Sequence, residues 1–239
     1  MNQQKGLNNR LLSIAAFSFL FAYLLSFLFE GQVLYSLLEF RGEQDSYYIV
    51  SAIAMHLAGL FSCGFFVKTF TRARNVMFIS MGVCLIATIP FFFAPSVLWA
   101  AGLIVSGYAS GCAVASWGRF LKAYAPKNER IKSCADVLIY SNIIMIGINV
   151  VAINLSPFIG LILSVFCLIA GMTFVWMMPA DAGGTKQRKM EEKPTGNIKK
   201  TLLLLCLFVF VITINSGLMY QVINPAFGHL SGLTSWYWA

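Results

Sequence analysis

Glu30 lies deeper inside an apolar segment, the run 11–38, than any other acidic residue of the chain. An ionisable side chain within a membrane is costly and usually has a function. If the helix of this run continues beyond Glu30, its carboxylate faces a central cavity, where it binds a proton or a cationic solute. If the helix ends near Phe29, Glu30 lies among the lipid headgroups. The sequence leaves both interpretations open.

Three further polar side chains lie inside other apolar runs. An imidazole changes charge near neutral pH and can relay protons, but a neutral His56 can equally join two helices through a hydrogen bond. Asn215 and Gln221 belong to a later run that is followed by Pro225. Polar side chains in such a run either join helices or line a solute path. Glu30, His56, Asn215 and Gln221 are therefore our candidates for solute binding or proton coupling.

The remaining reactive residue types are isolated from one another. All six cysteines lie in apolar runs, and none forms a C-x-x-C pair or lies among histidines, so they predict neither a disulfide framework nor a zinc site. An intramembrane enzyme would need paired carboxylates, a histidine cluster or a Ser–Lys dyad, and the runs contain only single groups. We expect no enzyme activity, no metal and no cofactor. The cysteines are Cys63, Cys84, Cys112, Cys134, Cys167 and Cys206.

The elements that must position these residues are membrane helices. Of the 239 residues, 59% are hydrophobic and only 11% are charged, and the mean hydropathy is +0.76. Soluble domains carry roughly 25% charged residues, so the composition excludes a soluble enzyme and a disordered tail. A net charge of +8 would indicate nucleic-acid binding in a soluble chain, but here the basic residues lie between apolar runs. We expect a multi-pass protein of the cell (inner) membrane whose partner is the lipid bilayer, not nucleic acid.

Seven apolar runs are long enough to cross a bilayer, which takes about 20 residues per helix. Helices are the expected form, because the alternating pattern of a membrane β-barrel is absent. The runs are 11–38, 46–67, 76–94, 97–117, 134–153, 157–178 and 201–221.

The basic residues predict the orientation of these spans. Sixteen of the 17 Lys and Arg residues lie at the N-terminus or in every second connection, and Arg41 is the exception. Because cytoplasmic loops are enriched in Lys and Arg, this alternation predicts a cytoplasmic N-terminus. The chain then divides into a six-helix bundle (1–178), a basic cytoplasmic linker (179–200) with Gly and Pro, and a seventh helix with an outer segment (201–239).

The loop between the second and third runs, taken together with the end of the second run, contains Gly64, Lys68, Thr71, Arg72 and Arg74. Six spans, a basic linker and a further span, with a glycine and an arginine pair in this loop, resemble the major facilitator superfamily (MFS) of secondary transporters. The loop departs from the family pattern in two places, because Lys68 replaces an acidic residue and Thr71 replaces a glycine. The resemblance covers residues 1 to about 225 in topology.

The fourth run is similar to the glycine-rich fourth helix of that family. It contains Gly102, Gly107, Gly111 and Gly118, with Arg119 at its inner end. Small residues let helix backbones approach closely, so we expect the pair Gly107 and Gly111 to contact another helix, with the lining of a cavity as the alternative.

The resemblance implies an all-α polytopic bundle in which spans 1–6 form two inverted three-helix repeats, followed by one further transmembrane helix. It also implies a cytoplasmic gate loop built from Gly64, Arg72, Arg74 and Arg119 together with Asp136, which would pair with Arg72 or Arg119. The alternative for Asp136 is a solvated residue in the first turn of a helix, where the helix dipole favours an acidic group.

The function implied is secondary active transport of a small solute by alternating access, with protons as the candidate coupling ion. The family has twelve spans, so we expect this chain to be truncated, inactive alone, and in need of a C-terminal half or a second subunit. The alternative is a membrane sensor module of a signalling or transcription regulator that uses the same helical block. The sequence names neither the solute nor the coupling ion.

Overall fold

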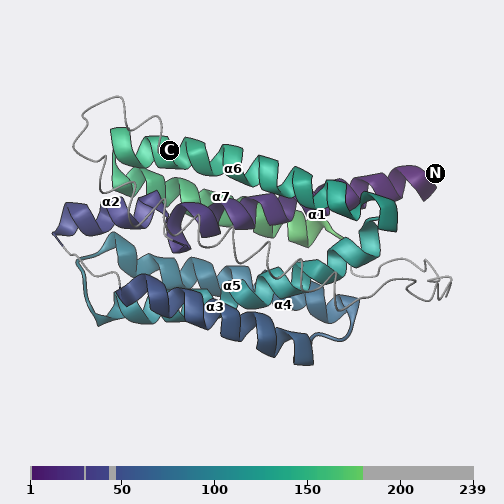
Figure 1. The fold of residues 1–239 in the computed structure, drawn as a ribbon, viewed down its shortest axis with the longest axis horizontal. Helices are drawn as coiled ribbons and strands as arrows, with labels where there is room; N and C mark the ends of the chain where they lie inside the picture. The colour runs from purple at the N-terminus through teal and green to yellow at the C-terminus, as the bar shows by residue number, and fades with distance from the viewer. Residues whose placement is uncertain (1, 30, 43–46, 180–239) are drawn as a thin grey trace, which may run out of the picture. The chain divides into compact units, whose positions relative to one another are not determined.

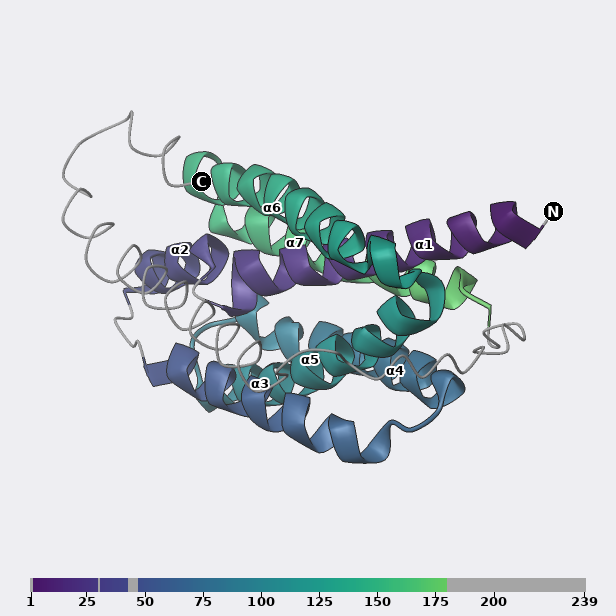
Figure 2. The same ribbon diagram turned by 45° about the vertical axis from the view of Figure 1, so that its right-hand side comes forward.

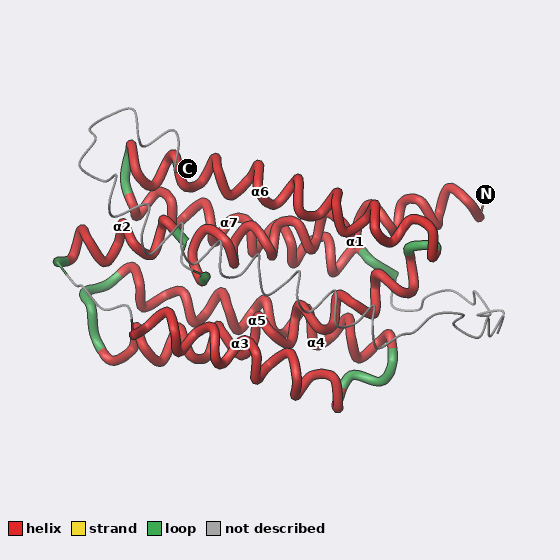
Figure 3. Tube along the Cα trace, in the orientation of Figure 1, coloured by secondary structure: helices red, strands yellow, loops and turns green. Residues whose placement is uncertain are grey.

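The computed structural model describes residues 2–29, 31–42 and 47–179, which belong to one compact unit. Within these ranges the chain is helical apart from short connections, and it contains no strand (Figure 3). The predicted all-α class is confirmed at this level. The predicted linker from residue 180 onward and the seventh span lie outside the described residues.

Six long helical segments form the bundle, and three of them carry a short π- or 3₁₀-helix. In chain order the elements are α1 (Asn2–Tyr23), the π-helix η1 (Leu24–Leu28), α2 (Gln32–Arg41), α3 (Tyr47–Phe66), α4 (Phe70–Thr88), the 3₁₀-helix η2 (Ile89–Phe92), α5 (Val97–Tyr124), the 3₁₀-helix η3 (Lys127–Glu129), α6 (Arg130–Asn154) and α7 (Pro157–Met177).

Five of these segments are long and apolar enough to cross a membrane, and the apolar part of α3, Val50–Phe66, is shorter. Each of the first six predicted runs coincides with one segment. The helices extend beyond the apolar runs, however: α5 continues seven residues past 117, to Tyr124, and α6 begins at Arg130. Basic side chains are compatible with a helix, so the helix continues where the apolar run stops.

The first span is not the single helix that the run 11–38 predicts. Helix α1 passes into the π-helix η1, the chain leaves helical geometry at Phe29, and α2 begins at Gln32 after Gly31. The interruption lies in the half of the bundle that contains the start of α7. The bond between Ser26 and Ser164, a residue in the first half of α7, indicates this position.

The helices form two groups, which Figures 1 and 2 show from two sides. Helix α5 packs against α3 and α4, whereas the first span packs against α6 and α7. Contacts of α1 with α5 and of α4 with α7 join the groups. Buried aromatic rings also cross between them, and the Phe27 and Phe91 rings meet edge to face with their centres 5.0 Å apart.

Glycines bring α3 and α5 together backbone to backbone. A Cβ atom on Gly107 would lie 2.4 Å from the Ala52 carbonyl oxygen, and one on Gly111 would lie 2.2 Å from that of His56. On the facing helix, a Cβ on Gly59 would lie 2.2 Å from the Tyr108 oxygen. The close contact that the sequence predicts for Gly107 and Gly111 is therefore present.

Candidate functional site

The interruption of the first span combines an irregular backbone with a tight turn. The Phe29 N–H donates to the Leu24 carbonyl at 2.7 Å, which closes the π-helix, and Phe29 then has φ −107° and ψ 89°. Gly31 precedes α2 and lies against η1, since a Cβ there would be 2.0 Å from the Ser26 carbonyl. Only glycine fits this position. π-Helices and breaks of this kind are frequent at functional sites.

His56 of α3 connects the interruption to α5. Its Nδ1 lies 2.8 Å from the Ser110 hydroxyl, and its ring meets the Phe29 ring edge to face with their centres 4.6 Å apart. The half-buried imidazole therefore contacts the residue immediately before Glu30 in the chain. We call Phe29, Gly31, His56 and Ser110 the break site. Glu30 itself lies outside the described residues.

Buried hydroxyl pairs surround the same part of the first span. The Tyr23 and Thr88 hydroxyls are 2.8 Å apart, and those of Ser26 and Ser164 are 3.2 Å apart. The first pair joins α1 to α4 and the second joins η1 to α7. In addition, the Oδ1 atom of Asn149 on α6 is buried without a hydrogen-bond partner in the described part of the chain. Hydroxyl pairs of this kind hold helices together where no water is available.

The end of the bundle away from the interruption is called the basic end. It contains the C-terminal ends of α3, α5 and α7 and the N-terminal ends of α1, α4 and α6. Three arginines there bind the carbonyls of helix C-termini. Arg119 donates to the Val67 and Lys68 carbonyls after α3, at 2.6 and 3.0 Å. Arg74 donates to two carbonyls of α7, at 2.7 and 3.3 Å. Arg130 does the same for α5, at 3.1 and 3.2 Å. A cation is favourable at a helix C-terminus, where the last carbonyls lack partners.

A fourth arginine, Arg10 of α1, joins two carboxylates and a hydroxyl. Its guanidinium donates to the Ser133 hydroxyl at 2.9 Å, forms an ion pair with Glu129, and lies 3.7 Å from an Asp136 carboxylate oxygen. The side chain of Arg10 is only 11% exposed.

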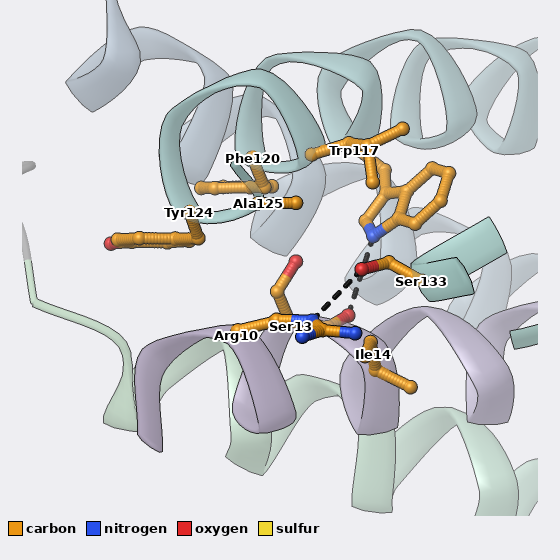
Figure 4. A pocket seen from close by; sticks show the side chains of 9 residues that line it. Arg10, Ser13, Ile14, Trp117, Phe120, Tyr124, Ala125 and Ser133 are labelled. Carbon is orange, nitrogen blue, oxygen red and sulfur yellow. Dashed lines mark hydrogen bonds between the residues drawn. The ribbon is translucent and has the colours of Figure 1, made fainter. Parts of the chain in front are cut away.

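Figure 4 shows the small pocket beside this cluster, which Ser13, Trp117 and Tyr124 also line. The pocket has a volume of about 10 Å³, room for about one water molecule. Trp117 is fixed by its indole N–H, which donates to the Ser13 carbonyl at 3.3 Å, and by stacking on Phe17.

Of the residues assigned to the predicted gate loop, Arg119 is brought to that loop, because its guanidinium binds the Val67 and Lys68 carbonyls there, whereas Arg74 binds the end of α7. Arg72 is exposed, and Gly64 is exposed with open space around its Cα. Asp136 lies beside Arg10 rather than beside Arg72 or Arg119, because the start of α6 packs against α1.

Two other candidates, Asn215 and Gln221, lie outside the described residues. In contrast, His56 has the interhelical hydrogen bond that one of its two sequence interpretations expects. The sequence marks Arg10 and Arg130 only as indicators of orientation, and their contacts with carboxylates and helix carbonyls become visible in the fold. A signal existed for Arg10, since Glu129 and Asp136 are seven residues apart and so share one helix face.

Comparison with known proteins finds no match among family models, curated proteins or solved structures.

Proposed function

We propose that residues 1–179 form one six-helix half of a secondary transporter, similar to those of the MFS, that moves a small solute by alternating access. The packing of the helices carries this proposal. If the first span, α3 and α4 are one triplet and α5, α6 and α7 the other, the leading helix of each triplet packs against the last two helices of the other. Two repeats related by a two-fold axis would exchange helices in this reciprocal way. Because each triplet has an odd number of spans, the repeats would have inverted topology.

The break site supports a solute path at the interface between the triplets. Transporters built from inverted repeats commonly bind solutes and coupling ions at interrupted helices. Here the interruption belongs to the leading helix of the first triplet, and His56 connects it to α5, the leading helix of the second. We assign solute contact to His56 and proton coupling to Glu30, with Asn215 and Gln221 as contributions of the seventh span.

The distribution of charge supports a multi-pass protein of the inner membrane with its N-terminus in the cytoplasm. Residues at the basic end include Lys68, Lys122 and Lys132, whereas the described part of the other end has Glu39 and Arg41. Positive charge is favoured on the cytoplasmic side. A reporter fused within the loop 125–129 should therefore be cytoplasmic, and an outer location would contradict this orientation.

Alternating access needs two halves that move about a shared site. The described bundle supplies one, so we place the second half in another six-helix unit. Purified chain 1–239 in liposomes should accordingly give no saturable uptake.

The proposal is tested first by solute binding. The purified protein is screened for thermal stabilisation by sugars, amino acids, carboxylates and organic cations. One class should stabilise it, His56→Leu should abolish the effect, and Arg41→Gln at the last residue of α2, outside the break site, should retain it. Native cells with the gene intact should then accumulate that class, and cells with a deletion or with His56→Leu should not. Absence of any stabilising class would contradict a solute site, and binding without accumulation would favour the sensor module.

A further inference from the structure

Apart from Arg119, which binds helix carbonyls, four cations at the basic end are exposed and have no carboxylate partner within the described part of the chain: Lys68, Arg72, Lys122 and Lys132. The two described carboxylates at this end are already engaged by Arg10, and the other three arginines bind helix carbonyls. We call the four residues the cationic strip.

We propose that the cationic strip is a binding site for the headgroups of anionic phospholipids. This inference does not depend on the proposed transport function, because it rests on the charge, exposure and surroundings of residues at the membrane surface.

Hydrogen bonds link the backbone segments that carry two of the strip's residues, Lys68 and Lys122. The carbonyl of Lys68 accepts a hydrogen bond from Arg119, and the carbonyl of Lys122 accepts one from Arg130. The guanidinium of Arg119 is itself exposed, so it adds to the positive charge beside Lys68. These bonds fix the backbone that carries both lysines, and they join the end of α3 to α5 and the end of α5 to the start of α6. Only the side chains of the strip must then become ordered when a phosphate binds, which limits the entropic cost.

Apolar side chains adjoin the cations on both sides of the strip. Phe65 and Phe66, just before Lys68, are 75% and 71% exposed, and Ile131, next to Lys132, is 84% exposed. A ligand that satisfies both surfaces needs an anionic group and an apolar chain in one molecule. A phospholipid has this chemistry, whereas a nucleic acid or a free phosphate supplies the anionic group without an apolar chain.

The test uses the full chain in nanodiscs of phosphatidylcholine, with or without phosphatidylglycerol. Phosphatidylglycerol should raise the melting temperature, and native mass spectrometry should retain it on the protein. Loss of the four cations should weaken retention by on the order of tenfold or more, since each basic residue at an anionic surface contributes attraction. The strip variant combines Lys68→Gln, Arg72→Gln, Lys122→Gln and Lys132→Gln.

A matched control removes the same charge from the chain beyond residue 180. It combines Lys186→Gln, Arg188→Gln, Lys189→Gln and Lys193→Gln. The control should keep the stabilisation by phosphatidylglycerol. If the control loses as much as the strip variant, total charge rather than the strip attracts the lipid and the proposal is wrong.

Two further measurements distinguish a lipid site from a phosphate site and allow for a strip variant that does not fold. Soluble glycerol phosphate added to phosphatidylcholine discs should not raise the melting temperature, and an equal effect would assign the site to a free phosphate. If the strip variant does not fold, the pairs Lys68→Gln/Arg72→Gln and Lys122→Gln/Lys132→Gln are measured separately, and each should lose part of the stabilisation. Pairs that fold and respond like the unaltered protein would overturn the proposal.

Discussion

The helices within each of the two groups are held together by different kinds of contact. Between α3 and α5 the backbones touch, because Gly59, Gly107 and Gly111 carry no side chain at the contact. The first span is bonded to α6 and α7 by polar side chains, with Arg10 at one end and Ser26 near the other. Each group also has one contact of the other kind: His56 is bonded to Ser110 between α3 and α5, and Gly171 of α7 lies close to the Ala16 carbonyl of α1.

The difference follows from the solvent. Lipid is as apolar as leucine, so membrane helices gain little from burying apolar area against each other and depend on close packing or on interhelical hydrogen bonds. A glycine contact needs no partner but tolerates no added atom. A polar contact tolerates small changes of shape but fails when one partner is removed. The predictions below separate these two behaviours.

The largest effect is expected from one methyl group at the glycine contact. Gly111→Ala would place a Cβ 2.2 Å from the His56 carbonyl oxygen, so α3 and α5 must separate. We expect a loss of about 2–3 kcal/mol in the free energy of unfolding, measured by thermal or SDS unfolding. Gly118→Ala is the control, because no atom lies within 4 Å of its added Cβ. It should stabilise α5 by up to about 1 kcal/mol, so two substitutions of the same kind in one helix should differ in sign.

The next effect concerns the polar contact. Arg10→Leu leaves Glu129 and Asp136 without their cation and should cost about 2 kcal/mol. This is less than for a fully buried pair, because the two carboxylate side chains are 42% and 27% exposed. Arg72→Leu, measured in a zwitterionic detergent, is the control and should change little. Equal melting temperatures for Arg10→Leu and Arg72→Leu would show that the ion pairs do not hold α1 to α6.

A smaller effect is expected where an arginine binds a helix end. Arg119→Gln removes two hydrogen bonds to the carbonyls after α3 and should cost about 1 kcal/mol. Hydrogen exchange should increase in the last turn of α3 and remain unchanged in α7, whose end is bound by Arg74. An equal increase at both ends would argue against a local cap.

The smallest effect is expected at the serine pair. Ser26→Ala removes one interhelical bond, but the Ser164 hydroxyl still donates to the Gly160 carbonyl at 3.0 Å. We expect a cost of about 0.6 kcal/mol, typical of such bonds in membranes, by the same unfolding assay. A loss as large as that of Gly111→Ala would remove the distinction between the two kinds of contact.

The sequence predicts the positions of six helices well, because each apolar run is long and is separated from the next by charged or turn residues. It also predicts the close contact of Gly107 and Gly111, because small residues four positions apart lie on one helix face. It does not predict the ends of α5 and α6, since amphiphilic side chains such as Lys122 continue a helix without being apolar.

The interruption of the first span shows where prediction from an apolar run fails. Hydropathy does not show whether the helix of the run 11–38 is continuous or interrupted. Only Glu30 and Gly31 mark the position of the break. The spacing of Glu129 and Asp136 indicates that the two carboxylates share a helix face, but it does not indicate which arginine lies beside them. Whether Asp136 lies beside Arg10 or Arg119 depends on which helices are neighbours, and that information resides in packing rather than in spacing along the chain.

The arginine caps also imply an order of assembly during synthesis. Arg130 binds a carbonyl only five residues before it in the chain, so the end of α5 is completed almost as soon as it is made. The carbonyls after α3 are bound only when Arg119 has been synthesised, about 50 residues later. The end of α7 binds Arg74, which is synthesised about 100 residues before it. A nascent chain would therefore first join α3 to α5 and only then receive α7, and Arg74 would mark the place where the last helix is received.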